Sequence, residues 1–253
     1  MRTVRRTLPS TAQTMQALVR SDVIVQSRHR ASIVMSVLIP LFFLFTWRDF
    51  LAVVGPTTVL ASCISVGLPS IGLMGYALVV ARDRELGVFQ RLRTTPCATW
   101  VIMLSRWMVQ LSIMIVMALL TVVAAIYIDD IHLSFSAMLM LLLAVVISGL
   151  LFLSLGQLIV ALFQASETVN SATRVIYISV LVTGILAQTL PKDSRWHGVV
   201  QWLPVGVSRL VISGALSWKT RDAHDLLPFL ATLTYTVIFA TVGIHRFRWK
   251  TNG

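Results

Sequence analysis

The stretch ARDRELGVFQRLRTTP, residues 81–96, interrupts an otherwise apolar chain. Six of its residues are charged, and among them Leu86, Phe89 and Leu92 recur at three-residue spacing. This spacing predicts a short amphipathic helix over residues 82–96, with one apolar face and one charged face. Apolar runs flank the stretch on both sides, so we expect it to lie outside a bilayer. Its basic character favours the cytoplasmic side.

The composition places the chain among membrane proteins. Of its 253 residues, 57% are hydrophobic and only 12% are charged, and the mean hydropathy is +0.83. A soluble domain of this length carries roughly 25% charged residues. The formal net charge of +11 raises the question of nucleic acid. The basic residues separate apolar runs and do not cover a soluble surface, so the pattern excludes nucleic acid as a partner.

The apolar runs predict an all-α membrane protein with six transmembrane helices. They lie at residues 31–47, 57–80, 100–128, 135–163, 175–190 and 226–244. In this arrangement, fifteen of the 21 Lys and Arg residues fall on one side. Lys and Arg are retained in cytoplasmic loops, so the N and C termini are expected in the cytoplasm of a multi-pass protein of the inner (cytoplasmic) membrane.

Three segments outside the spans have their own predicted structure. Residues 1–30 form the first domain, a cytoplasmic amphipathic interface helix, because apolar residues recur every three or four positions; a loosely ordered basic tail is the alternative. Residues 31–253 form the six-span domain. Within it, residues 191–222 carry Trp196, Trp202 and Trp218 between half-length apolar runs. Such a pattern predicts extracellular re-entrant helices that enter the outer leaflet and turn back.

Sequence motifs for catalysis are missing. The chain has no Gly-x-x-x-x-Gly-Lys-Ser/Thr sequence for phosphate binding, no His-Glu-x-x-His and no Gly-x-Ser-x-Gly. Its five histidines are scattered, and Cys63 and Cys97 show no metal-ligand spacing. We therefore predict no enzyme, no catalytic residues, no metal site and no cofactor bound by this chain. Arg106, near the cytoplasmic end of the third span, is expected to reach lipid headgroups or a partner rather than a substrate.

The order Arg-Glu-Leu-Gly-Val-Phe-Gln-Arg-Leu-Arg-Thr-Thr-Pro resembles the loop between the second and third spans of ABC-2 type transporter permeases. The matching residues are Glu85, Gly87, Arg91, Leu92, Arg93, Thr95 and Pro96. In that family this loop is the coupling helix, which docks into a cleft on the ATP-hydrolysing subunit. A second resemblance runs from Thr183-Gly184 through Pro191, Trp196 and Trp202 to Leu203-Pro204, where Leu203 replaces the family's usual Asn.

The resemblance implies a set of residues that contact an ATPase subunit, namely Arg84, Glu85, Gly87, Phe89, Arg91, Leu92 and Arg93. Phe89 and Leu92 would enter an apolar groove on the ATPase, and the charged residues would lie at its rim. It also implies a complex of two permeases, either two copies of this chain or a related pair, with two copies of the ATPase subunit. ATP and Mg would be bound by that partner.

The spans contain few charged residues, so a hydrophobic or amphipathic substrate taken from the inner leaflet fits them best. We favour a drug-like compound, as in multidrug efflux and antibiotic resistance, and then an envelope lipid or glycolipid. No substrate-binding residue can be assigned from the sequence. A membrane scaffold or sensor without transport stays an alternative. An intramembrane enzyme is disfavoured because no pair of intramembrane acids or histidines is evident.

Overall fold

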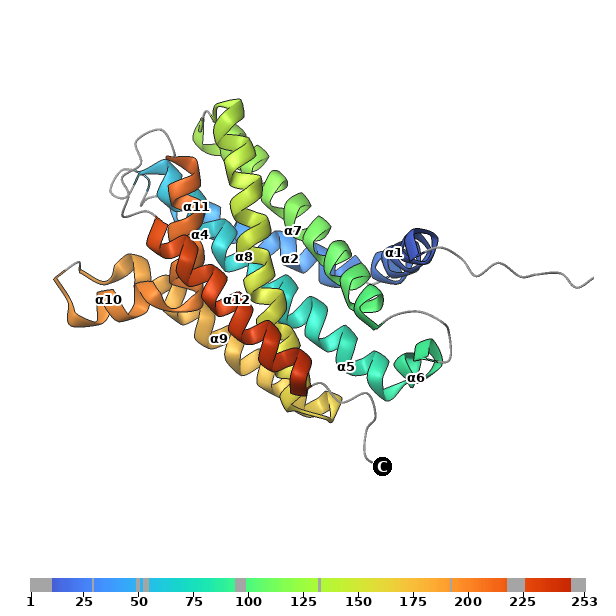
Figure 1. The fold of residues 1–253 in the computed structure, drawn as a ribbon. Coiled ribbons are helices and arrows are strands. Elements are labelled where there is room, and N and C mark those ends of the chain that lie inside the picture. The colour runs from blue at the N-terminus through green and yellow to red at the C-terminus, as the bar shows by residue number, and fades with distance from the viewer. Residues whose placement is uncertain are drawn as a thin grey trace, which may run out of the picture.

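The computed structural model describes residues 11–28, 30–48, 51, 55–93, 99–131, 133–191, 193–217 and 226–246. The regular elements in these ranges are all helices, and most of them are arranged as a bundle (Figure 1). Their bounds are α1 Thr11–Arg28, α2 Arg30–Thr46, α4 Pro56–Pro69, η2 Ser70–Ala77, α5 Leu78–Glu85, α6 Val88–Arg93, α7 Thr99–Asp129, α8 Phe135–Leu162, α9 Ser166–Thr189, α10 Arg195–Trp202, α11 Pro204–Leu216 and α12 Leu226–Arg246.

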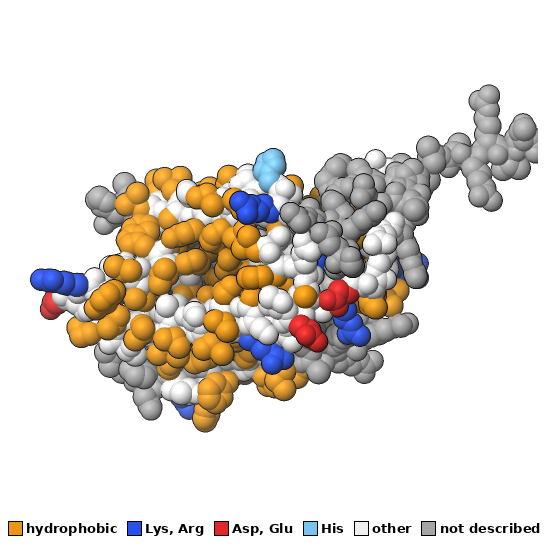
Figure 2. All heavy atoms as spheres, turned by 90° about the horizontal axis from the view of Figure 1, so that it is seen from below, with side chains coloured by type: hydrophobic (Ala, Val, Ile, Leu, Met, Phe, Trp, Pro, Cys, Tyr) orange, Lys and Arg blue, Asp and Glu red, His pale blue; other side chains and the backbone are white. Residues whose placement is uncertain are grey.

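Within the described residues, five helices are long and apolar enough to cross a membrane, and α2 is a shorter apolar helix. They coincide with the six predicted spans, which confirms the all-α membrane fold class. Hydrophobic side chains cover most of the face seen in Figure 2, and charged side chains are few on it. A lipid-facing belt has this distribution, because charged side chains are costly in the hydrocarbon core.

The second span is the centre of the bundle. It runs without interruption through α4, η2 and α5, over 30 residues from Pro56 to Glu85, and 83% of its most apolar part is buried. The corresponding share of α12 is 11%, so α12 lies at the periphery. A helix of 30 residues is about 45 Å long, whereas the hydrocarbon core is about 30 Å thick. One end of the second span therefore extends beyond the core.

A π-helical segment, η2, follows Pro69 in the middle of this span. Proline and small residues such as Gly72 favour a bend and close contact between helices. Gly72 does pack closely: a Cβ atom on it would lie 2.8 Å from the backbone of Phe152 in α8. Gly156 of α8 packs against the same part of the second span: a Cβ atom added to it would lie 2.4 Å from the carbonyl oxygen of Gly72. The two glycines let the second and fourth spans touch through their backbones.

Two boundaries differ from the sequence prediction. The second span continues past residue 80 to Glu85, into the stretch expected to be a separate helix. The fifth span begins at Ser166, so residues expected as a polar turn form the first turns of α9. Residues 195–216 form α10 and α11, two helices bent by 80° at their junction, a geometry found in broken spans and in re-entrant loops. Trp218 lies outside the described residues.

Helix α1 contacts the N-terminal part of α7 and is seen nearly end-on in Figure 1, crosswise to the bundle. Helix α6, the turn between α8 and α9, and the end of α12 lie at this same end of the bundle (Figure 1). The helix pair α10–α11 and the turn between α7 and α8 lie toward the opposite end. The predicted capping box at Ser10 and the predicted helix start at Thr95-Pro96 lie outside the described residues.

Candidate functional site

Gly87 divides the predicted amphipathic helix into two helices. Helix α5 ends at Glu85, and α6 begins at Val88. Between them Gly87 has a φ of +69°, and its N–H donates to the carbonyl of Arg84 at 3.2 Å. This left-handed conformation ends helices and is strained for any residue with a Cβ atom. The prediction of one continuous helix over residues 82–96 is therefore wrong, because the motif's glycine acts as a helix terminator.

Arg84 is only 2% exposed and its side chain points into the bundle. Its guanidinium donates to the carbonyl oxygens of Val160 at 2.8 Å, Phe163 at 2.7 Å and Gln164 at 2.6 Å. These carbonyls lie at the C-terminal end of α8, where a helix has no further N–H groups to satisfy them. The positive charge also complements the negative end of the helix dipole. Arg84 thus caps α8, and the prediction that it contacts an ATPase does not agree with its burial.

Glu85, the next residue, binds the start of α9. Its carboxylate accepts hydrogen bonds from the N–H of Ser166 and from the Oγ of Ser166, both at 2.6 Å. A carboxylate at a helix N-terminus satisfies free N–H groups and complements the positive end of the dipole. Two adjacent residues at the end of the second span therefore hold both sides of the turn between α8 and α9.

Asp83 connects the same end of the span to α7. Its carboxylate forms an ion pair of 2.6 Å with Arg106, which is buried and so does not reach toward headgroups as predicted. The guanidinium carbon of Arg106 lies 4.8 Å from the ring centroid of Phe89, a cation–π arrangement. Phe89 is completely buried within the chain. In this structure the ring anchors α6 to the bundle, and its contact with a groove on a partner stays a prediction.

Helix α1 joins this cluster through Asp22. The Oγ of Ser105 on α7 donates to the Asp22 carboxylate at 2.9 Å. Burial raises the pKa of the Asp22 carboxyl above its ordinary value, and the nearby Arg106 guanidinium and the Ser105 hydroxyl lower it in part. Asp22 and Asp83 thus both lie near Arg106. The interface helix and the loop after the second span share one set of polar contacts.

Other predicted site residues lie in α6 or beside it. Gly87 occupies the turn, and Arg91, Leu92 and Arg93 belong to α6, but their side chains lie outside what the structure describes. Leu86 is the apolar residue that sequence reasoning did not select: it precedes the glycine and is 62% exposed. The three-residue spacing placed Leu86 on the same face as Phe89, and only the break at Gly87 separates the exposed residue from the buried one.

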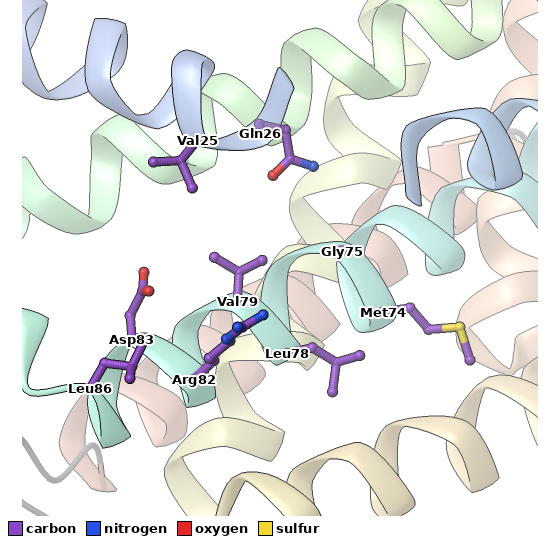
Figure 3. A pocket seen from close by; sticks show the side chains of 9 residues that line it. All are labelled: Val25, Gln26, Met74, Gly75, Leu78, Val79, Arg82, Asp83 and Leu86. Atoms are coloured by element: carbon purple, nitrogen blue, oxygen red, sulfur yellow. The ribbon is translucent and has the colours of Figure 1, made fainter. Parts of the chain in front are cut away.

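A groove opens between α1 and the second span. A cavity of about 400 Å³ lies among Val25 and Gln26 of α1 and residues of η2 and α5 that include Leu78, Val79 and Asp83. Figure 3 shows Val25 and Gln26 directed from α1 toward the side chains of Val79 and Asp83. A second cavity of about 200 Å³ shares these walls and reaches Arg106 and Gln110 of α7. The groove combines apolar walls with polar groups.

Within the described residues, no three His, Cys, Asp or Glu side chains gather in a way that could hold a metal ion. A family model described as ABC-2 type transporter matches residues 11–205 of the chain. This range runs from the start of α1 to the first turn of α11, so it contains the polar contacts around Arg106, the groove and the bundle's central span. No curated protein matches the chain.

Proposed function

Because this chain belongs to the ABC-2 type transporter family, we propose that it is the permease subunit of an exporter driven by separate ATPase subunits. In this proposal two permeases and two ATPase subunits form the complex, and ATP and Mg are bound by the ATPase. The chain lies in the cytoplasmic membrane with both termini inside, as the distribution of Lys and Arg favours. The end of the bundle that carries α1 and α6 faces the ATPase.

The observation that carries the proposal is the way three consecutive residues fix the cytoplasmic end of the second span. Asp83 is paired with α7, Arg84 with α8 and Glu85 with α9. Helix α6, which follows, is held by the buried ring of Phe89. A displacement of α6 by an ATPase would therefore move four helices together as one body. Packed helices that shift as a unit are the ordinary means by which such transitions spread through a bundle.

For the contact itself we propose the exposed surface of the turn between α5 and α6. Leu86 offers an apolar side chain, and Arg82 and Gln90 are exposed on either side of it. Arg91, Leu92 and Arg93 follow in the sequence of α6. An apolar centre with polar and charged residues around it is the usual composition of a stable interface.

For the substrate we propose a hydrophobic or amphipathic molecule that enters by the groove between α1 and the second span. Val25, Leu78 and Val79 suit an apolar portion, and Gln26 and Asp83 suit a polar one. A drug-like compound is our first choice and an envelope lipid or glycolipid our second. A scaffold or sensor without transport is the competing function, and it differs in needing no ATPase.

Affinity purification of the full chain from its native membrane tests the proposal. We expect a stoichiometric ATPase subunit that carries a phosphate-binding loop. Leu86→Ala should weaken its retention by about tenfold, because the variant truncates the apolar centre of the contact. Ile244→Ala is the matched control: Ile244 is 66% exposed near the same end of the bundle, on α12, and should have no effect.

Two results contradict the proposal in different ways. A chain that purifies without any ATPase supports the scaffold or sensor. An ATPase that is retained equally by Leu86→Ala and Ile244→Ala places the contact elsewhere on the permease.

A further inference from the structure

A buried arginine at the other end of the bundle forms no ion pair with any residue that the structure describes. Arg209 lies on α11, and only 9% of it is exposed. Its Nε atom has no hydrogen-bond partner, and the ion pairs among the described residues involve Arg48 and Arg106 instead. A buried guanidinium without a counter-charge is unfavourable, since desolvation is not repaid by any attraction. Inside membrane domains, such a charge usually marks the path of a ligand.

The surroundings of Arg209 are polar but supply no negative charge. The side chain adjoins a small space lined by Ser62 and Ser65 of α4, Gly184 and Ala187 of α9, and Gly206 of α11. Both serine hydroxyls donate to carbonyls of their own helix, at 2.7 Å and 2.6 Å. Their oxygens remain as acceptors but are neutral. No carboxylate of the described residues lines this space, so none of them compensates the charge of Arg209 there.

We propose that Arg209 binds the anionic headgroup of the transported molecule, an amphiphile that carries a carboxylate, phosphate or sulfate. The inference rests on the proposed function and narrows its substrate class. The guanidinium is suited to such groups, because its planar N–H donors match the oxygens of an oxyanion. Arg209 lies on α11, toward the end of the bundle opposite α6, where a substrate leaves in an export cycle (Figure 1).

The space beside Arg209 is closed in this structure and has no room for a water molecule. Binding therefore requires α11 to separate from α4 and α9. The helices meet closely there at a small residue: a Cβ atom on Gly184 would lie 3.5 Å from Val205 of α11 and from Val66 of α4. The bound headgroup would stabilise the open arrangement, which is the selection of one of two states by a ligand.

The test uses the full chain in nanodiscs of phosphatidylcholine and follows thermal unfolding. Dodecyl phosphate should raise the unfolding temperature in proportion to its binding, whereas dodecyltrimethylammonium, with the same apolar tail, should not. Inorganic phosphate alone should act weakly, because it lacks the tail. Arg209→Gln should weaken the response to dodecyl phosphate by roughly tenfold or more, the size expected for charge-assisted hydrogen bonds. Arg195→Gln, an exposed arginine on neighbouring α10, should leave it unchanged.

Nanodiscs that contain phosphatidylglycerol distinguish a bilayer lipid from a transported molecule. If phosphatidylglycerol alone raises the unfolding temperature and dodecyl phosphate then adds nothing, the anion is a bilayer lipid and the substrate assignment is overturned. An equal response of wild type and Arg209→Gln also overturns it. If Arg209→Gln does not fold, Arg209→Met, which has no charge and an apolar side chain, gives the same comparison. None of these measurements needs an ATPase. The anion-binding proposal can therefore fail while the permease proposal stands, and the reverse.

Discussion

The two ends of the bundle differ in whether the charge of a buried arginine is compensated by other groups of the chain. At the end with α1 and α6, Arg84 makes three hydrogen bonds to backbone carbonyls and Arg106 is paired with Asp83. At the opposite end, Arg209 is also buried, but among the described residues no carboxylate forms an ion pair with it. A buried charge that the chain compensates serves the structure, since removing it leaves other groups unpaired. A buried charge that the chain does not compensate serves a ligand. The comparison therefore distinguishes the end of the bundle where arginines hold helices together from the end where an arginine binds a ligand.

The largest expected effect concerns the compensated end. Phe89→Ala should lower the free energy of unfolding by about 3 kcal/mol or more, because a completely buried aromatic ring leaves a cavity. The loss also removes the surface over which Arg106 lies. Unfolding of the purified protein in a denaturing detergent series measures this. A variant that is as stable as wild type would mean that α6 is not packed against the bundle, and the mechanical account would fail.

A smaller effect is expected at the turn between the two helices. Gly87→Ala should cost about 1 kcal/mol, because alanine is strained at a φ of +69°. The space around Gly87 is not limiting, since the nearest atom to an added Cβ is 3.9 Å away. Gly198→Ala on α10 is the matched control: it has open space and lies inside a helix, so it should be neutral or slightly stabilising. Equal effects of the two substitutions would show that the break between α5 and α6 is not enforced by backbone conformation.

The sequence predicted the membrane helices well, because a run of apolar residues reports its length directly. It failed to predict which residues of the charged stretch point inward. Arg82 and Arg84 are the same residue type two positions apart, yet the first is exposed and the second is buried. Their direction depends on the rotational phase of the second span, and the π-helical turns of η2 change that phase without any clear mark in the sequence.

The motif's glycine was also misread for a physical reason. Isolated glycines occur inside helices at a modest cost, so Gly87 alone did not reveal a helix end. The role of Arg209 could not be inferred either. The sequence places it in a segment with several other basic residues, and only the packing of α11 against α4 and α9 buries it.

One comparison of unfolding energies tests the central claim most directly, namely Arg84→Met against Arg209→Met, with Arg82→Met as the exposed control. We predict that Arg84→Met lowers the free energy of unfolding by about 2 kcal/mol or more, because three carbonyls at the end of α8 lose their charged donor. Arg209→Met should leave it unchanged or raise it, because an uncompensated buried charge is removed. If Arg209→Met is destabilised as strongly as Arg84→Met, the chain itself compensates both arginines and the distinction between the two ends is contradicted.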